Sequence, residues 1–330
     1  MTYILVDTLN MFYRARHVVR GDDIETKIGM AYSIMFGAIN KAWRDFDGAH
    51  VVFCFEGRSW RKDFYTPYKA NRTEKRAALS PKDKEEDQQY FAAFDELRTF
   101  IEKRTNCTTL QHKNCEADDF IGRWIQNHPN DDHVIISSDS DFYQLLSPTV
   151  SQYNGISNEH HTVNGTFNDK GKPVIDKKTK IQKHIGDPNW VLFEKCVRGD
   201  SADNVFSAYP GVRKKGSKSK VGLLEAYADK DSKGFDWNNF MLQRWTDHEG
   251  VEHRVLDDYN RNKTLIDLTL QPDDIKTALD ESITTQVQKE PTSSVGVHFL
   301  RFCGKHDLAR ISTNAETHAQ YLNATYGNRN

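Results

Sequence analysis

The chain has 330 residues, with 45 Lys and Arg against 47 Asp and Glu, and a formal net charge of −2 at pH 7. This length is enough to bury a core without disulfides, and the 37% hydrophobic content argues against a disordered chain. No apolar run approaches the ~18 residues of a membrane span, so we expect no contact with a membrane. No signal peptide is visible and the five cysteines are scattered, so we expect a cytoplasmic protein.

The first half of the chain alternates predicted strands with predicted helices. The predicted strands are short apolar runs at residues 3–6, 51–55, 107–110 and 134–137. Runs with helical spacing cover residues 27–46, 81–101, 116–124 and 142–146. Pro81 after Ser80 is typical of the first position of a helix. Strands separated by helices predict an α/β fold with a mainly parallel sheet.

The second half differs in pattern. Residues 154–185 carry turn signals at Asn164-Gly165 and Lys170-Gly171, which predict a polar hairpin. From Asp187 onward the pattern is mostly helical. We therefore predict an α/β domain over residues 1–185 and a mainly helical region over residues 186–330.

Three basic runs stand out in a chain that is nearly neutral overall. Residues 58–76 hold seven Lys and Arg with two acids, residues 170–183 hold six Lys with one Asp, and residues 213–220 hold five Lys and Arg with no acid. One such run is typical of a solvated loop. With three such runs, binding to a polyanion such as nucleic acid explains the pattern as well as solvated loops do.

Acidic residues stand where predicted strands end or predicted helices begin. These seven are Asp7, Glu56, Glu116, Asp118, Asp119, Asp139 and Asp141. Sites in open α/β sheets form beyond the carboxyl ends of the strands, so we expect the seven to converge. Asp200 and Asp203 are one helical turn apart and are expected to face the same crevice.

An oxygen-only set of ligands selects hard cations, namely Mg²⁺ or Mn²⁺. Two such ions about 4 Å apart can activate water and stabilise the leaving oxygen during phosphodiester cleavage. One Asp after a strand is more often a helix cap, and Asp118 or Asp119 alone could be an N-terminal helix charge. Acids at four separate strand or helix ends favour the metal site.

The order of these motifs resembles the structure-specific 5′-nucleases, which include flap endonucleases, the 5′-nuclease domain of bacterial DNA polymerase I, and bacteriophage 5′-3′ exonucleases and ribonuclease H. The motifs that carry the resemblance are Asp7, Glu56-Gly57, Trp60-Arg61-Lys62, Tyr68-Lys69, Arg72, Glu116-Ala117-Asp118-Asp119, Ser138-Asp139, Asp141-Phe142, Gly199-Asp200 and Asp203-Asn204. The similarity covers roughly residues 1–230 and is greatest to the bacteriophage type.

The resemblance implies a doubly wound sheet in a catalytic domain, a helical arch at about residues 58–90, and a helix–turn–helix element for duplex binding within residues 186–330. It implies that the first metal ion is held by Asp7, Glu56, Glu116, Asp118 and Asp139. The second would be held by Asp119, Asp141, Asp200 and Asp203. Glu56 stands where the family more often has Asp, so its contact is expected to pass through water.

The resemblance also implies roles for basic and aromatic residues. Lys69 and Arg72 match a pair that contacts the scissile phosphate, and Tyr13 matches an aromatic residue that stacks on the terminal base. The nucleic-acid contacts expected from the basic runs are Arg61, Lys62, Arg213, Lys214, Lys215 and Lys218. Residues 209–216 lack the family's G-x-G hairpin, which leaves its K⁺ site an open question.

The function that follows is a monomeric metal-dependent 5′-3′ exonuclease or flap endonuclease. It would act on DNA flaps, nicked duplexes and RNA-primed duplexes during phage replication, with two Mg²⁺ ions, replaceable by Mn²⁺, as cofactors. A single-stranded-DNA-binding protein or a sliding clamp are the partners considered. The alternatives are a PIN-type endoribonuclease, which needs about four acids and no arch, and a non-catalytic branched-DNA-binding protein.

Overall fold

The computed structural model describes residues 1–18, 23–209 and 222–327. Contacts divide the chain into two compact units. The first comprises residues 1–59, 79–185 and 272–330, and the second comprises residues 60–78 and 186–271. The predicted boundary at residue 185 coincides with one of these divisions. The predicted domains differ from the units in two segments, because residues 60–78 pack with the second unit and residues 272–330 pack with the first.

The first unit is built on a seven-stranded sheet with the order β3-β2-β1-β4-β5-β6-β7. Its strands are β1 Thr2–Asp7, β2 His50–Cys54, β3 Thr108–Leu110, β4 Asp132–Ile136, β5 Val150–Asn154, β6 Glu159–Thr162 and β7 Gly165–Asn168. Strands β1 to β5 pair in parallel, and β6 and β7 are antiparallel. The prediction of a mainly parallel sheet is confirmed, with β5 as a strand that the sequence pattern did not indicate.

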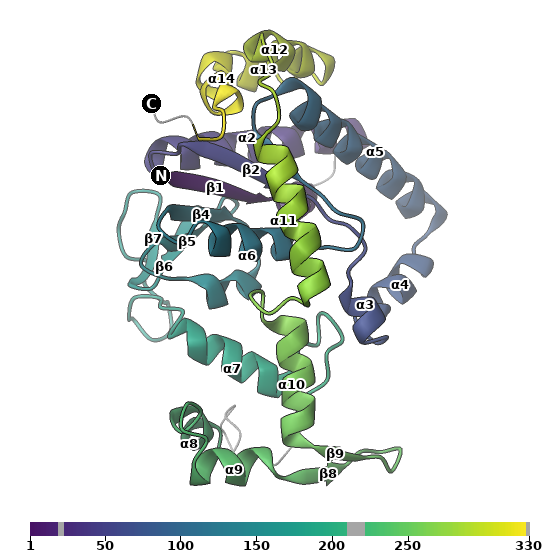
Figure 1. The fold of residues 1–330 in the computed structure, drawn as a ribbon. Helices are drawn as coiled ribbons and strands as arrows, with labels where there is room; N and C mark the ends of the chain where they lie inside the picture. Colours follow the sequence, from purple (N-terminus) through teal and green to yellow (C-terminus); the bar gives the residue numbers. More distant parts are fainter. Residues whose placement is uncertain (19–22, 210–221, 328–330) are drawn as a thin grey trace. The chain divides into compact units, whose positions relative to one another are not determined.

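Helices cover both faces of this sheet (Figure 1). Its helical segments are α1 Thr8–Val18, α2 Ile24–Asp45, α5 Pro81–Arg104, α6 Ala117–Asn127, the 3₁₀ helix η1 Ser140–Leu145, α11 Asp273–Val287, α12 Val295–Lys305, α13 Ala309–Ser312 and α14 Ala315–Asn323. Ile4 points into the core shared with α2 and α5, whereas its neighbour Tyr3 contacts Trp124 of α6. Alternate side chains of a strand face opposite ways, so the sheet is doubly wound as predicted.

Helices α12 to α14 belong to the core of the first unit. Phe299 and Phe302 of α12 contact Phe36 of α2 and Phe100 of α5, and Tyr321 of α14 is fully buried. The C-terminal segment was predicted as part of a duplex-binding region. In the structure it packs on α2 and α5 of the first unit, and its part in duplex binding stays a prediction.

The second unit is mainly helical. Its elements are α3 Arg61–Phe64, α4 Ala70–Ala77, α7 Pro188–Arg198, α8 Leu223–Ala228, α9 Phe235–Met241, the hairpin of β8 Arg244–Thr246 and β9 Glu252–Arg254, and α10 Val255–Ile266. Phe193, Trp237 and Tyr259 lie in its core together with Tyr68, which comes from the segment predicted to be an arch. Within the described ranges, no helix combines the length and hydropathy of a membrane span.

A buried histidine on β4 makes a test of stability. His133 is 2% exposed, and neither ring nitrogen makes a hydrogen bond of ordinary geometry to another described residue. Burial lowers its pKa to about 4. An unbonded buried polar group costs about 1–3 kcal/mol, so we expect His133→Phe to raise the melting temperature at pH 7.

The pH dependence of that gain has a definite sign. Between the unfolded pKa of about 6.5 and the native pKa of about 4, only the unfolded state binds the proton at His133, so the wild type loses stability as the pH falls. The advantage of His133→Phe in melting temperature should therefore grow between pH 7 and pH 5. An unchanged melting temperature at both pH values would contradict the idea and indicate that water satisfies the ring.

Candidate active site

Three predicted ligands form one hydrogen-bonded chain at the carboxyl ends of β1 and β4. Asp7 is the last residue of β1 and is 6% exposed. The Ser137 hydroxyl donates to Asp7 Oδ2 at 2.8 Å and accepts the Asp139 N–H at 3.0 Å. Asp139 is the N-cap of η1, and its Oδ1 accepts the Asp141 N–H at 3.0 Å. The structure thus fixes Asp7, Asp139 and Asp141 relative to one another.

A second group of acids surrounds the N-terminus of α6. Glu56 follows β2 by two residues, and its Oε2 accepts the N–H of Ala117 at 3.3 Å. Glu116 is the N-cap and is 4% exposed, with Ser59 donating to its Oε2 at 2.6 Å. Asp119 is fully buried, and its Oδ2 accepts the N–H of Glu116 at 2.9 Å to complete a capping box. Asp119 therefore has a structural role, and its contact with a metal ion stays a prediction.

Acids of both groups influence the buried thiol of Cys54 at the end of β2. Burial raises the pKa of this thiol, and the carboxylates of Asp7, Glu56 and Asp118 raise it further. Three carboxylates from β1, from the segment after β2 and from α6 therefore act on one atom. This concentrated negative charge, offered by oxygen atoms alone, fits a hard divalent cation such as Mg²⁺ or Mn²⁺.

The acids of the second unit lie on a tight loop after α7. Asp200 and Val205 exchange backbone hydrogen bonds of 2.9 and 2.7 Å, which close the loop. Gly199 precedes it with a φ of +73°, and a Cβ there would lie 2.3 Å from the carbonyl oxygen of Val205. Only glycine fits this position, so the backbone conformation that leads into the loop of Asp200 and Asp203 is fixed.

Both acids of this loop form ion pairs with basic side chains in the structure. Lys195 Nζ lies 2.8 Å from Asp200 Oδ2. Burial acts to raise the pKa of Asp200, but the charge and hydrogen bond of Lys195 hold that pKa below its ordinary value. Asp203 has contacts with Arg72 at 2.6 Å and with Lys69 at 3.5 Å.

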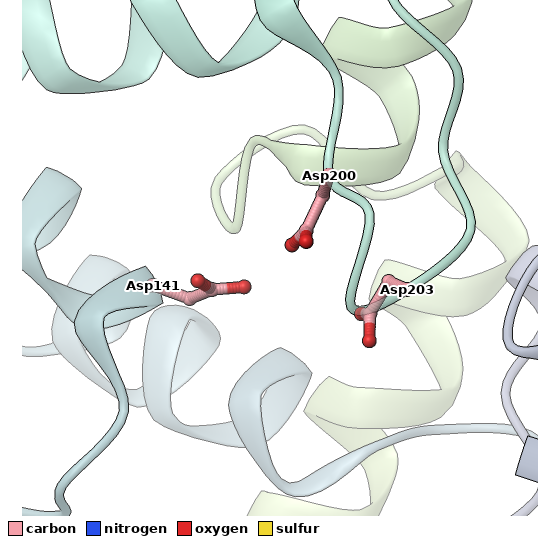
Figure 2. Close-up of side chains that lie close together, drawn as sticks. All are labelled: Asp141, Asp200 and Asp203. Atoms are coloured by element: carbon pink, nitrogen blue, oxygen red, sulfur yellow. The ribbon is translucent and has the colours of Figure 1, made fainter.

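Asp203 is thus neutralised by the same two residues that were predicted to contact the scissile phosphate. The Tyr68 hydroxyl also donates to its Oδ2 at 3.0 Å. Figure 2 shows Asp200 and Asp203 on their loop and Asp141 on η1 of the first unit. That the acids of the two units serve a single site stays a prediction.

The structure contradicts one of the predicted nucleic-acid contacts. Arg61 is 1% exposed, its Nε donates to the carbonyl oxygen of Leu265 at 2.8 Å, and its guanidinium lies over the Trp60 ring. A side chain buried in this way holds α3 to the end of α10 and cannot reach a phosphate. Lys62 beside it is exposed and remains a candidate.

The remaining predicted contacts differ in where they lie. Tyr13 is partly buried and packs against Tyr90 and Phe91 of α5, so its ring has a place in the core, and stacking on a base stays a prediction. The residues outside the described ranges are Arg213, Lys214, Lys215 and Lys218, together with most of the segment considered for K⁺.

Several residues of the site were not singled out from the sequence. Ser137 and Ser59 position the carboxylates of Asp7 and Glu116, and Lys195 pairs with Asp200. Serine and lysine are common surface residues, so only the position of Ser137 directly before the Ser138-Asp139 motif gave a signal. The carboxylate that each serine contacts lies 57 or more residues away along the chain, so no local sequence pattern reveals the contact.

Comparison with known proteins agrees with this arrangement. Residues 2–178 match the family model of the 5′-3′ exonuclease, N-terminal resolvase-like domain. The chain belongs to this family. The region matched contains β1 to β7 and all the predicted ligands except Asp200 and Asp203.

The chain is similar in sequence to a DNA polymerase I, a 5′-3′ exonuclease and a flap endonuclease. The chain is 26% identical over 304 residues to DNA polymerase I of Rhizobium leguminosarum, covering 87% of this chain and 26% of that protein. It is 28% identical over 188 residues to a 5′-3′ exonuclease of Bacillus subtilis, covering 55% and 54%. It is 27% identical over 232 residues to flap endonuclease Xni of Pseudoalteromonas translucida, covering 68% and 78%. The chain thus spans about a quarter of the polymerase and about half of the Bacillus protein.

Solved structures confirm the fold. A zinc-bound 5′-exonuclease of bacteriophage T5 matches with a TM-score of 0.58 at 18% identity, covering 87% of this chain and 99% of that one. A flap endonuclease of bacteriophage T5, solved as a pseudo-enzyme–product complex with DNA and metal ions, matches with a TM-score of 0.52 at 17% identity, covering 97% and 100%.

Proposed function

We propose that this chain is a metal-dependent 5′-nuclease that hydrolyses phosphodiesters near the 5′ end of branched or nicked DNA. The observation that carries the proposal is the grouping of Asp7, Glu56, Asp118 and Asp139 at the carboxyl edge of a parallel sheet. Asp7 and Asp139 share the hydroxyl of Ser137, and Asp7, Glu56 and Asp118 act on one buried thiol. Capping alone does not require four separate strand or helix ends at one edge of the sheet to carry acids.

Asp7, Glu56, Glu116, Asp118 and Asp139 are the residues proposed to hold divalent cations, with Mg²⁺ as the natural ion. Such cations supply the Lewis acidity that phosphodiester hydrolysis requires and neutralise developing charge. Asp200 and Asp203 are proposed to complete the ligand set together with Asp141. No side chain is needed as a general base in this scheme.

Lys69 and Arg72 are proposed to contact the scissile phosphate. Both pair with Asp203 in the structure, which holds the two positive charges beside each other although the Arg72 side chain is more than half exposed. Lys69 occupies the left-handed region with a φ of +54°, immediately before α4. Charges fixed in advance near developing negative charge stabilise a transition state more than mobile ones.

The substrate class proposed is a 5′ flap, a nicked duplex or an RNA-primed duplex, with ribonuclease H activity and primer removal in phage replication as the finer hypotheses. The named relatives are DNA polymerase I, 5′-3′ exonucleases and a flap endonuclease, and one structural neighbour was solved with DNA and metal ions. A single-stranded-DNA-binding protein or a sliding clamp is the proposed protein partner. The proposed assembly is a monomer, and the proposed location is the cytoplasm of a bacterial host.

The testing experiment compares 5′-labelled flap, nicked and RNA-primed duplexes with the matching 3′ flap. We expect cutting near the junction of the 5′ flap with Mg²⁺ or Mn²⁺, none in EDTA, and little with Ca²⁺. Ca²⁺ prefers longer and looser oxygen shells, so it polarises water less than Mg²⁺ does. A 3′ flap should survive conditions in which the 5′ flap is cut.

The outcomes separate the alternatives. Equal cutting of 5′ and 3′ flaps, or cutting of single-stranded RNA alone, would favour a PIN-type endoribonuclease. Tight flap binding without cutting in any metal would favour a non-catalytic branched-DNA-binding protein. The second alternative predicts loss of acids from the cluster, whereas all seven acids of the first unit are retained here.

A further inference from the structure

The lysine-rich segment of residues 170–183 continues the sheet beyond β7. Its first turn follows β7 directly. Asn168 on β7 lies opposite Glu159 on β6, and Glu159 lies opposite Asn154 on β5. Tyr153, which precedes Asn154, lies opposite Ile136 on β4, and Ile136 lies opposite Val6 on β1. Asn168 therefore lies in the same row as Asp7. The turn of residues 169–172 emerges from the sheet edge that carries the acids.

This turn is fixed by its own backbone. Asn168 Oδ1 accepts the N–H groups of Lys170 and Lys172 at 2.9 and 3.0 Å, and the Asn168 N–H donates to the Lys172 carbonyl oxygen at 2.8 Å. Gly171 has a φ of +68°, which suits glycine. The backbone positions from which Lys170 and Lys172 project are thus set without any ligand.

Lys170 and Lys172 are exposed, and neither has an ion pair among the described residues. Lys183 of the same segment differs, because it lies 2.9 Å from Glu159. Lysines often protect an exposed sheet edge from pairing with another chain. That need is met here by the chain itself, since Val174 donates to the Thr166 carbonyl oxygen at 2.9 Å and covers β7.

We propose that the turn of Lys170 and Lys172 binds the phosphate backbone of duplex DNA that runs along this sheet edge from the acidic site. The inference rests on the proposed function, which puts the scissile phosphate at Asp7. Four strand steps separate β1 from β7, or about 19 Å at ~4.8 Å per step. At ~3.4 Å per base pair this is about six base pairs from the cut.

The occupant is assigned as a duplex from the chemistry of the segment. Residues 168–183 contain no aromatic side chain, so they offer no platform on which unpaired bases could stack. Lysine ammonium groups act as point charges toward phosphates of any sequence. A rigid turn that presents two of them suits the regularly spaced phosphates of a rigid duplex.

The same segment supplies a matched control. Lys177, Lys178 and Lys180 lie on a second turn, held by Asp176 Oδ1, which accepts the N–H groups of Lys178 and Thr179 at 2.9 and 2.8 Å. The intervening residues 173–175 run antiparallel to β7, which carries this second turn about 10 Å away from the edge of the acids. These lysines should contribute little to the proposed contact, although there are more of them.

The test compares Lys170→Gln/Lys172→Gln with Lys177→Gln/Lys178→Gln/Lys180→Gln by fluorescence anisotropy in EDTA. The substrates are flaps whose duplex arms extend either about 4 or about 10 base pairs from the junction, titrated between about 50 and 200 mM salt. We expect the wild type to gain affinity with the longer arm and the double variant to lose that gain. The slope of log Kd against log salt should fall by about 0.9 for each phosphate that is no longer neutralised, or about 1.8 in total.

The triple variant should keep both the gain in affinity and a slope close to that of the wild type. Equal losses in the two variants would overturn the proposal and indicate a general effect of charge. An unchanged slope in the double variant would also overturn it. Because binding in EDTA needs no cleavage, a wild type that binds in this way but never cuts would contradict the proposed function and leave the DNA contact standing.

Discussion

Asp139→Ala is expected to abolish cleavage while duplex binding persists. Asp139 sits where the chain of hydrogen bonds from Asp7 through Ser137 passes to Asp141, so its carboxylate is proposed to serve both cations. Loss of several kcal/mol of transition-state stabilisation corresponds to at least about a 10³-fold lower single-turnover rate. Removing an acid should not weaken attraction to phosphates, so the Kd for duplex should stay equal or fall.

The alanine variant also removes a cap, because Asp139 Oδ1 accepts the Asp141 N–H. Asp139→Asn separates the two effects, since an amide oxygen can accept the same hydrogen bond without the charge. We expect the asparagine variant to keep the wild-type melting temperature and still lose cleavage at saturating Mg²⁺. A rate within a few-fold of the wild type would exclude Asp139 as a ligand.

Lys69→Ala and Arg72→Ala are each expected to slow single-turnover cleavage more than they weaken binding. A contact that strengthens in the transition state lowers the rate of chemistry, whereas a uniform contact changes affinity alone. Removal of one preorganised charge or donor costs about 10²-fold in rate. The measurement is the single-turnover rate at saturating enzyme, with Kd determined in parallel by anisotropy.

Arg244→Ala is a suitable control for Lys69→Ala and Arg72→Ala. Arg244 is an exposed arginine of the same unit that also pairs with an acid, Glu252. Its removal should change neither the rate of chemistry nor the melting temperature by much, because exposed ion pairs contribute only ~0–1 kcal/mol. If Lys69→Ala and Arg72→Ala lower affinity and rate equally, the two residues are ordinary phosphate contacts.

The sequence by itself determined the parallel sheet and the places of its acids. Val51 to Phe55 form a continuous apolar run, which is what a strand buried on both faces requires. Ser80 and Pro81 mark the start of α5, where the structure shows Ser80 as the N-cap. Asp7 and Glu116 could be recognised because strand ends and helix starts are local features of the chain.

Tertiary structure alone decided the features that depend on distant partners. The pattern of β5, Val-Ser-Gln-Tyr-Asn, is too polar to indicate a strand, and its pairing beside β4 makes it one. Arg61 resembles a DNA contact in a basic run, but its hydrogen bond to Leu265, 204 residues away, buries it.

The same holds for the charges of the second unit. Asp203 pairs with Arg72 across 131 residues of chain, and residues 60–78 pack with the second unit, where Tyr68 joins the core, although they follow β2 closely in sequence. Spacing along a chain specifies which face of a strand or helix a residue occupies. It does not specify which distant carboxylate or carbonyl will neutralise a charge, because that depends on how the elements pack.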